Sequence, residues 1–361
     1  MKQVLNEHKK IAWLILCVLL TLGGLFCLWR IGALGHGLPA ETAAERWRGE
    51  SETAFAQVSC FVPVDEALSE GQIQSFRIEL LKALSDAALD GEGSDGLWRD
   101  AWNAVGKLKV SSDKGSCDAS VIAVGGDFFS FHPLRLLGGD YLREDDLMHD
   151  RVLLDLELAW QLFGGTDLQG MPVRINDRPF VVAGVVERES DDASLAAYTA
   201  GQGLYMSCDA YAALTEEANC ITAYEFVLAE PVDGYSLKLA QEKFPLGRGE
   251  ALQNTGRYSY GRLLKLLPRM DERAMQGMGM IYPYWENAAR VTENRCARLL
   301  LTAILLFTLP LISLIVWLWR LGGKGKEAFA ERVFPRLREG VEEAFRRPAR
   351  RRWEKKHAGE K

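Results

Sequence analysis

Two long uncharged apolar segments constrain this 361-residue chain more than any other feature. The first covers 11–29 (IAWLILCVLLTLGGLFCLW) and the second covers 299–319 (LLLTAILLFTLPLISLIVWLW). An apolar helix of about 20 residues is long enough to cross a hydrocarbon core of ~30 Å. A soluble fold would have to bury both segments on all sides. We therefore predict transmembrane helices over 11–30 and 298–320.

The first segment could instead be a cleaved secretory signal peptide, because Lys9 and Lys10 precede it. The apolar region of a signal peptide is typically about 7–15 residues long, and this segment is longer. Leu38-Pro39-Ala40 is also a poor match to the small residues that a cleavage site requires. We therefore expect a retained anchor.

The charge distribution predicts the orientation in the membrane. Residues 1–10 carry three lysines and one glutamate, and residues 324–361 carry 13 basic and seven acidic residues. Between the apolar segments, residues 31–297 carry 24 basic and 41 acidic residues. The positive-inside rule then predicts a plasma-membrane protein with cytoplasmic 1–10, an extracytoplasmic domain over 31–297 and a basic cytoplasmic tail over 321–361. The acidic outer domain argues against nucleic acid or an anionic lipid surface as its partner.

Four of the seven cysteines lie in the predicted outer domain, where the environment favours disulfides: Cys60, Cys117, Cys208 and Cys220. Four cysteines allow three connectivities, and the sequence does not choose among them. Cys208 and Cys220 bracket a short segment and would pair easily. The alternative is that the four are small buried thiols.

Apolar periodicity predicts a mixture of helices and strands over 31–297. Helices are expected over 72–89, with a buried face from Ile73 to Ala88, and over 43–48, 98–105, 156–162, 209–217 and 236–244. Strands are expected over 56–64, 107–110, 120–124, 151–154, 173–175, 180–186, 204–206 and 224–229. Residues 245–280 allow no assignment, whereas 288–298 continue into the second membrane helix. In the tail, apolar residues spaced by four over 324–347 predict an amphipathic helix for the inner leaflet or a partner, or else a solvated segment.

Sequence motifs for catalysis are absent. The chain has no phosphate-binding G-x-x-x-x-G-K-[ST], no G-x-S-x-G and no H-E-x-x-H. His132 and His149 have no metal-ligand spacing and are interpreted as surface or loop residues. The acid pairs 145–146 and 191–192 are interpreted as solvated loop charges rather than calcium ligands. We therefore predict no catalytic, cofactor-binding or metal site, and a protein that is not an enzyme.

An extended pattern runs through VIAVGGDFFSFHPLRLLGGDYL, DRVLLDLELAWQLFGGTDLQGMPVRINDRPFVVAGVV and LYMSCDAYAAL. Its order of elements resembles the MacB-like extracytoplasmic core domain of ABC-type permease subunits. The resemblance is best over 121–212, with a strand and Phe-rich turn at 121–129, Leu-x-x-Gly at 136–139 and a helix ending in Leu-Phe-Gly at 159–164. It is weaker over 56–110, where a strand and an amphipathic helix still fit the porter-like half of that family.

The resemblance implies an α+β extracytoplasmic domain of mixed sheets with packed helices, formed by a porter-like half and a second subdomain. It also implies a non-enzymatic subunit of a MacB/FtsX-like ABC assembly, with a separate cytoplasmic ATPase, a possible fuller permease and a possible homodimer. Gly23-Gly24 could allow close approach of membrane helices. The usual permease has three membrane helices after the domain, and this sequence has one, so we expect no complete translocation unit in this chain. The alternative is a membrane-anchored ligand-sensing or scaffold protein without an ATPase.

Overall fold

The computed structural model describes residues 2–86, 96–144, 146, 148–198, 203–272, 276–277 and 279–328. The chain divides into two compact units. Unit 1 comprises Met1–Cys27 with Leu301–Lys361, and unit 2 comprises Leu28–Leu300. The amphipathic helix predicted over 324–347 falls almost entirely outside the described residues.

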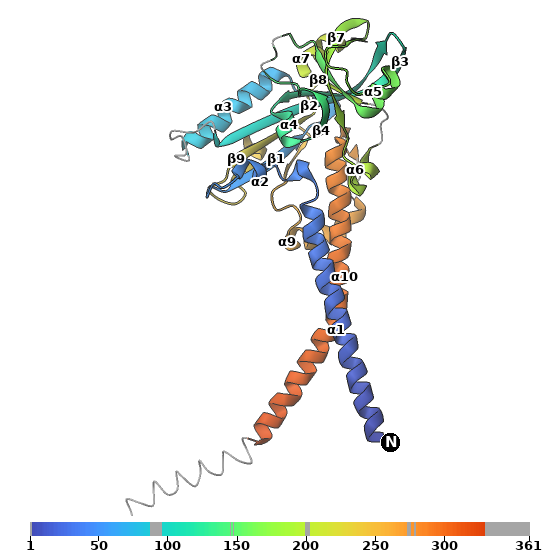
Figure 1. Cartoon of the computed structure of the whole chain (residues 1–361). Coiled ribbons are helices and arrows are strands. Elements are labelled where there is room, and N and C mark those ends of the chain that lie inside the picture. The colour runs from blue at the N-terminus through green and yellow to red at the C-terminus, as the bar shows by residue number, and fades with distance from the viewer. Residues whose placement is uncertain are drawn as a thin grey trace, which may run out of the picture. The chain divides into compact units, whose positions relative to one another are not determined.

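Helices and strands follow one another through the whole described chain (Figure 1). The helices are α1 (Lys2–Gly35), α2 (Ala43–Arg48), α3 (Glu70–Asp86), α4 (Phe128–Phe131), α5 (Leu156–Leu162), α6 (Asp192–Ala197), α7 (Cys208–Thr215), α8 (Tyr235–Lys243), α9 (Tyr260–Leu266) and α10 (Tyr284–Ala328), with 3-10 turns η1 (Pro39–Glu41), η2 (Val64–Glu66) and η4 (Leu267–Glu272). The strands are β1 (Phe55–Phe61), β2 (Trp98–Ser112), β3 (Gly115–Gly126), β4 (Arg135–Gly139), β5 (Arg151–Asp155), β6 (Pro172–Ile175), β7 (Arg178–Glu187), β8 (Gly203–Ser207), β9 (Ala223–Ala229), β10 (Glu250–Gln253), β11 (Gln276–Gly277) and β12 (Met280–Ile281).

Unit 1 contains the apolar parts of α1 and α10, the two helices that are long and apolar enough to cross a membrane. They pack closely at Gly24, where a β-carbon would lie 2.6 Å from the Phe307 ring. The Trp13 indole also donates a hydrogen bond to Ser313 Oγ at 3.2 Å. Leu306 and Phe307 of the same chain therefore cover the Gly23-Gly24 surface that the sequence offered for contact between two copies.

Unit 2 is built on one mixed ten-stranded sheet. Its strand order is β10-β1-β9-β2-β3-β8-β5-β7-β4, and β6 pairs with β2 and β7. The β3–β8 and β5–β7 pairs are parallel, whereas the other pairs in this sheet are antiparallel. Strands β1, β2, β3, β9 and β10, from residues 55–126 and 223–253, form one side of the sheet, and β4, β5, β7 and β8, from residues 135–207, form the other. This arrangement confirms the predicted α+β class with mixed pairing.

Helices cover both faces of the sheet, and each face buries its own apolar core. On one face, α3 lays Ile73, Phe76 and Leu80 against strand residues such as Tyr224 and Phe226. On the other face, Phe128 and Phe131 of α4 pack with α2 and with Trp285 of α10. Phe128 and Phe131 are therefore core residues. Burial of one large apolar side chain contributes ~1.5–3 kcal/mol, so both layers stabilise the sheet.

The short helix expected over 98–105 was wrong, because these residues begin the long strand β2. Residues 100–104 are buried on both faces, since β2 is a central strand between β9 and β3. A strand that is covered on both sides lacks the alternation of polar and apolar residues that identifies a half-buried strand. The remaining predicted strands and helices of 31–297 are confirmed to within a few residues, and the unassigned stretch 245–280 contains β10, α9, η4 and β11.

Candidate functional site

A buried cluster of charged residues lies where the first turns of α10 meet the sheet domain. Arg257, in the loop between β10 and α9, is only 4% exposed. Its Nη1 and Nη2 donate to the two carboxylate oxygens of Glu286 on α10, at 2.7 and 2.8 Å. The same guanidinium also contacts Glu41 of η1 at 3.3 Å and Glu293 of α10 at 3.1 Å. One arginine therefore joins three segments of unit 2 that are distant in sequence.

A second arginine extends this cluster along α10. Arg290 Nε donates to Glu286 Oε1 at 2.6 Å, and its Nη2 pairs with Glu250 of β10. The guanidinium also lies over the Tyr282 ring, 3.8 Å from the centroid. We call Glu41, Glu250, Arg257, Glu286, Arg290 and Glu293 the Arg257 cluster. The bidentate Arg257–Glu286 pair fixes both the distance and the orientation of the two groups.

Polar contacts continue from the Arg257 cluster into the centre of the sheet. Asn254 Nδ2 donates to Glu41 Oε1 at 3.2 Å, and Asn254 Oδ1 lies 2.9 Å from Ser59 Oγ of β1. Ser59 Oγ in turn donates to Glu225 Oε1 of β9 at 2.6 Å. The other Glu225 oxygen is paired with His132 Nε2. Buried polar contacts therefore link α10 and η1 to β1 and β9, the second and third strands of the sheet.

His132 corrects the interpretation from the sequence. It does lie in the loop between α4 and β4, but it is 1% exposed and therefore not a surface residue. Its ring lies between Phe128 and Trp285, with centroid distances of 4.6 and 4.1 Å. Glu225, its ion-pair partner, is 93 positions away in the chain, so no local pattern could reveal the pair. His149 is a partly exposed residue that pairs with Asp209 across 3.5 Å, as a surface position allows.

The Arg257 cluster contains four carboxylates and two guanidinium groups. The pKa values of two of the carboxylates, Glu41 and Glu286, shift in opposite directions. Burial raises the pKa of Glu41 to about 7, although Arg257 opposes the shift. Burial alone would also raise the pKa of Glu286, but Arg257 and Arg290 outweigh it and hold that pKa below its ordinary value. Glu286 is therefore the firmly ionised partner, whereas Glu41 can take up a proton near neutral pH.

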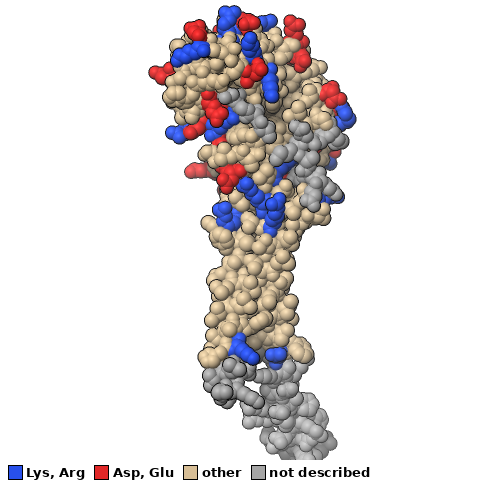
Figure 2. All heavy atoms as spheres, turned by 90° about the vertical axis from the view of Figure 1, so that its right-hand side faces the viewer, with Lys and Arg blue, Asp and Glu red and all other residues tan. Residues whose placement is uncertain are grey.

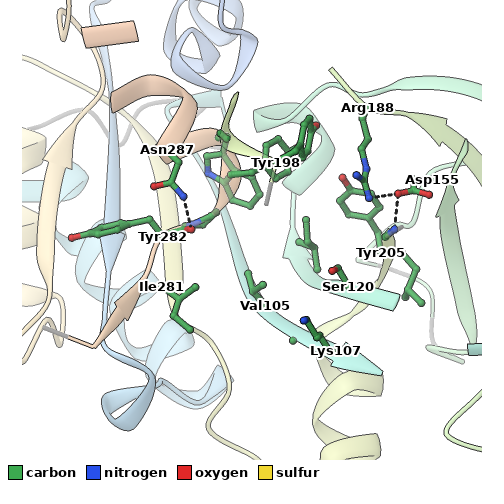
Figure 3. Close-up of a pocket in the computed structure, with 18 residues that line it drawn as sticks. Val105, Lys107, Ser120, Asp155, Arg188, Tyr198, Tyr205, Ile281, Tyr282 and Asn287 are labelled. Atoms are coloured by element: carbon green, nitrogen blue, oxygen red, sulfur yellow. Dashed lines mark hydrogen bonds and ion pairs between the residues drawn. The ribbon is translucent and has the colours of Figure 1, made fainter. Parts of the chain in front are cut away.

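A cavity of about 400 Å³ is lined in part by the first turn of α10 (Figure 3). Val105 and Ile122 of the β2–β3 hairpin form part of its wall, and Ile281, Pro283 and Trp285 form another part. Val105 and Ile281 expose 41% and 51% of their surface. Four tyrosines also line the cavity: Tyr198, Tyr205, Tyr282 and Tyr284. Its size and mostly apolar walls suit a small organic molecule.

A charged pair, Arg188 and Asp155, lies at one side of the cavity (Figure 3). Asp155 also accepts from the Gly203 amide at 2.6 Å and caps α5 through the Leu158 amide. Burial raises the pKa of Asp155, and Arg188 opposes this. Two lining residues have a buried polar atom without a hydrogen-bond partner in the structure, Trp285 Nε1 and Asn287 Oδ1. An unpaired buried donor and acceptor are costly unless a water or a ligand completes them.

The four cysteines predicted to form disulfides are free thiols in the structure. Cys60, Cys208 and Cys220 are buried, and Cys117 is partly exposed. Cys60 on β1 and Cys117 on β3 are three strand spacings apart, about 14 Å, whereas a disulfide requires roughly 7 Å or less between Cα atoms. That pairing is therefore excluded by the sheet order. Cys208 and Cys220 share one apolar cluster, and burial, together with Cys220, raises the pKa of Cys208. A bond between these two stays a prediction.

The acid pairs 145–146 and 191–192 do not belong to the Arg257 cluster. Asp191 caps α6 by accepting from the amides of Ala193 and Ser194, and Asp145 lies outside the described residues. Among the residues that the structure describes, no three His, Cys, Asp or Glu side chains gather as metal ligands would. The sequence did not single out the Arg257 cluster. The spacing of Glu286, Arg290 and Glu293 just before an apolar run was the available signal, since it places three charges on one helix face.

Comparison with known proteins finds one matching family model and several similar solved structures. The model of the MacB-like periplasmic core domain matches residues 53–244. The extracellular domain of the ABC-type transporter YknZ from Gram-positive bacteria aligns with 14% identity and a TM-score of 0.39, over 55% of this chain and 99% of that one. The periplasmic region of MacB from Actinobacillus actinomycetemcomitans aligns with 18% identity and a TM-score of 0.38, over 59% and 94%. No curated protein matches the chain.

The fold and the two apolar helices define a membrane protein with an extracytoplasmic α+β segment. The family match covers more than half of the sequence, and the chain belongs to the family of MacB-like periplasmic core domains. This family consists of domains of ABC-type transporter permeases, which are typically not enzymes themselves. The sequence-based assignment to the family is thereby confirmed.

Proposed function

We propose that this chain is a non-enzymatic subunit of a MacB/FtsX-like ABC assembly and couples a separate cytoplasmic ATPase to its extracytoplasmic domain. The observation that carries the proposal is the Arg257 cluster, which fixes the first turns of α10 to η1 and β10. A shift of α10 would have to move Glu286 and Glu293 together with their partners, because breaking a buried ion pair costs ~3–5 kcal/mol. The helix and the sheet would then move as one.

The proposed orientation has both termini in the cytoplasm and 31–297 outside. Support comes from the basic ends of the chain and from the extracytoplasmic location that the family name describes. Epitope tags at the two termini, probed with protease on intact and permeabilised cells, test it. We expect protection of both tags until the membrane is opened. Cleavage of either tag on intact cells would contradict the orientation.

The partner is tested by purifying the intact chain from its native membrane in mild detergent and identifying what accompanies it. We expect stoichiometric recovery of an ABC ATPase, with or without a fuller permease. The second step compares ATP hydrolysis by two variant complexes. Glu293→Gln removes the negative charge that faces Arg257, and Glu242→Gln removes an exposed charge on α8. Coupling predicts altered hydrolysis only for Glu293→Gln. Equal behaviour of both variants and the wild type would count against the cluster as a coupling element.

A second candidate function is ligand sensing or scaffolding without an ATPase. The cavity beside the first turn of α10 favours it, because an occupant there would touch Trp285 and Asn287 directly. Native mass spectrometry of the wild type and of Ser120→Phe, which fills the cavity from β3, tests this idea. A small molecule that accompanies only the wild type, together with a signalling protein and no ATPase, would favour sensing over coupling.

A further inference from the structure

Basic residues gather at the end of unit 2 from which the chain enters the two apolar runs. Arg30 follows the first run directly, and Arg298 directly precedes the second. In the folded unit, Leu263 of α9 is 1% exposed and packs with Ile31 of α1 and Leu300 of α10. The segment of α9 and η4 therefore lies beside the positions at which the chain leaves the predicted hydrocarbon core.

Basic residues are the only charged residues in the parts of these segments nearest the apolar runs, whereas Asp271 and Glu272 stand at the end of η4. Residues 28–34, 260–270 and 294–300 contain no aspartate or glutamate. We call their six cations the basic collar: Arg30, Arg262, Lys265, Arg269, Arg295 and Arg298. Figure 2 shows blue side chains gathered at the lower margin of the charged surface of unit 2. The collar is thus a local exception within a domain that carries an excess of acidic residues.

The collar combines exposed cations with exposed apolar side chains. Lys265 and Arg269 are exposed, and Tyr260 and Leu264 of the same segment expose 51% and 47% of their surface. Arg262 is partly engaged, because its guanidinium donates to the carbonyl groups of Gln253 and Thr255. Apolar and cationic side chains on one exposed segment are typical of a surface that lies in the headgroup region of a bilayer.

We propose that the basic collar binds the anionic headgroups of phospholipids in the leaflet from which unit 2 emerges. Lysine and arginine side chains beside an anionic membrane surface each add to binding, and Tyr260 and Leu264 can enter the apolar boundary below the headgroups. The net acidity of residues 31–297 does not oppose this, because screening limits the reach of distant exposed charges to about 8–10 Å at physiological salt.

The test uses the full chain in a neutral detergent, titrated with phosphatidylglycerol or phosphatidylcholine and analysed by native mass spectrometry. We expect tighter binding of phosphatidylglycerol, weakened by added salt. The double variant Lys265→Gln/Arg269→Gln should weaken it about tenfold or more, because each cation contributes about fivefold. The matched control, Lys82→Gln/Lys109→Gln, removes two exposed lysines from α3 and β2 and should bind like the wild type.

Three results would overturn the proposal: equal binding of the two lipids, equal losses in the collar and control variants, or no loss in the collar variant. Glycerol phosphate is added as a competitor, and displacement of the lipid at equal concentration would instead identify a site for a soluble phosphate. Thermal unfolding verifies that each variant is folded. If the double variant does not fold, Arg30→Gln, an exposed position on α1, is compared with Lys82→Gln in the same way.

Discussion

The Arg257 cluster and the basic collar both contain arginines of α10, and Arg290 and Arg298 lie less than three helical turns apart, yet the two groups are used in different ways. Arg290 is buried and paired with Glu286 and Glu250, whereas the collar cations Lys265 and Arg269 are exposed. A buried arginine is tied to the geometry of its partners, and an exposed one retains its charge for a partner outside the chain. The comparison teaches that the surroundings of a cation, and not its type, separate a structural role from a recognition role.

The largest expected effect is that of Arg257→Ala on stability. The substitution leaves Glu41, Glu286 and Glu293 buried without their shared cation, so the free energy of unfolding should fall by about 3–5 kcal/mol. Denaturant unfolding of the full chain in detergent, followed by tryptophan fluorescence, measures it. The control Arg269→Ala removes an exposed arginine from the collar. Similar losses in both variants would break the distinction between cluster and collar.

The second prediction concerns pH and Glu41. The pKa of this carboxyl is raised from 4.5 to about 7 in the folded state, so between these values the folded chain binds more protons than the unfolded one. Its contribution to stability is therefore full below about pH 4.5 and is lost as the pH rises through about 7, by up to ~3 kcal/mol.

Glu41→Gln removes this titration. Stability should fall less between pH 5.5 and 8 in the variant than in the wild type, and Glu242→Gln should follow the wild type. Unfolding curves at several pH values provide the comparison. A wild-type pH dependence that Glu41→Gln leaves unchanged would show that Glu41 is ionised throughout this range.

A smaller effect is expected for Arg290→Lys, which retains the charge but loses the planar fork that contacts Glu286 and Glu250 together. We expect a loss of about 1–2 kcal/mol in unfolding free energy. Arg269→Lys, the same change in the collar, should alter neither stability nor binding of phosphatidylglycerol. If Arg290→Lys is also neutral, charge rather than geometry holds the cluster together.

The smallest effect on stability is expected for the collar variant Lys265→Gln/Arg269→Gln. Both side chains are exposed, so the free energy of unfolding should remain within about 0.5 kcal/mol of the wild type. The same variant should show the largest change in lipid binding. A stability loss of several kcal/mol would instead place these residues in the packing of α9 on α1 and α10.

Much of the fold could be predicted from local patterns. The helix over 70–86 and the hairpin around Asn176 and Asp177 follow from apolar spacing and turn residues. The strand over 98–105 was missed because residues 100–104 at its centre are buried on both faces. The site was missed for a related reason, since Glu41, Arg257 and Glu286 are each unremarkable charged residues in their own segments and meet only in the folded unit.

The sequence by itself determined the two apolar helices, the opposing charges of the segments around them and the family of the outer domain. These features depend on composition and on the order of neighbouring residues, which folding does not change. The tertiary structure alone decided that His132 is buried against Glu225, that Arg257 holds three carboxylates, and that a domain with excess acid carries a basic collar. The reason is physical: burial and pairing depend on which distant segments come together, and they determine whether a charged group is neutralised inside the fold or left available to a partner.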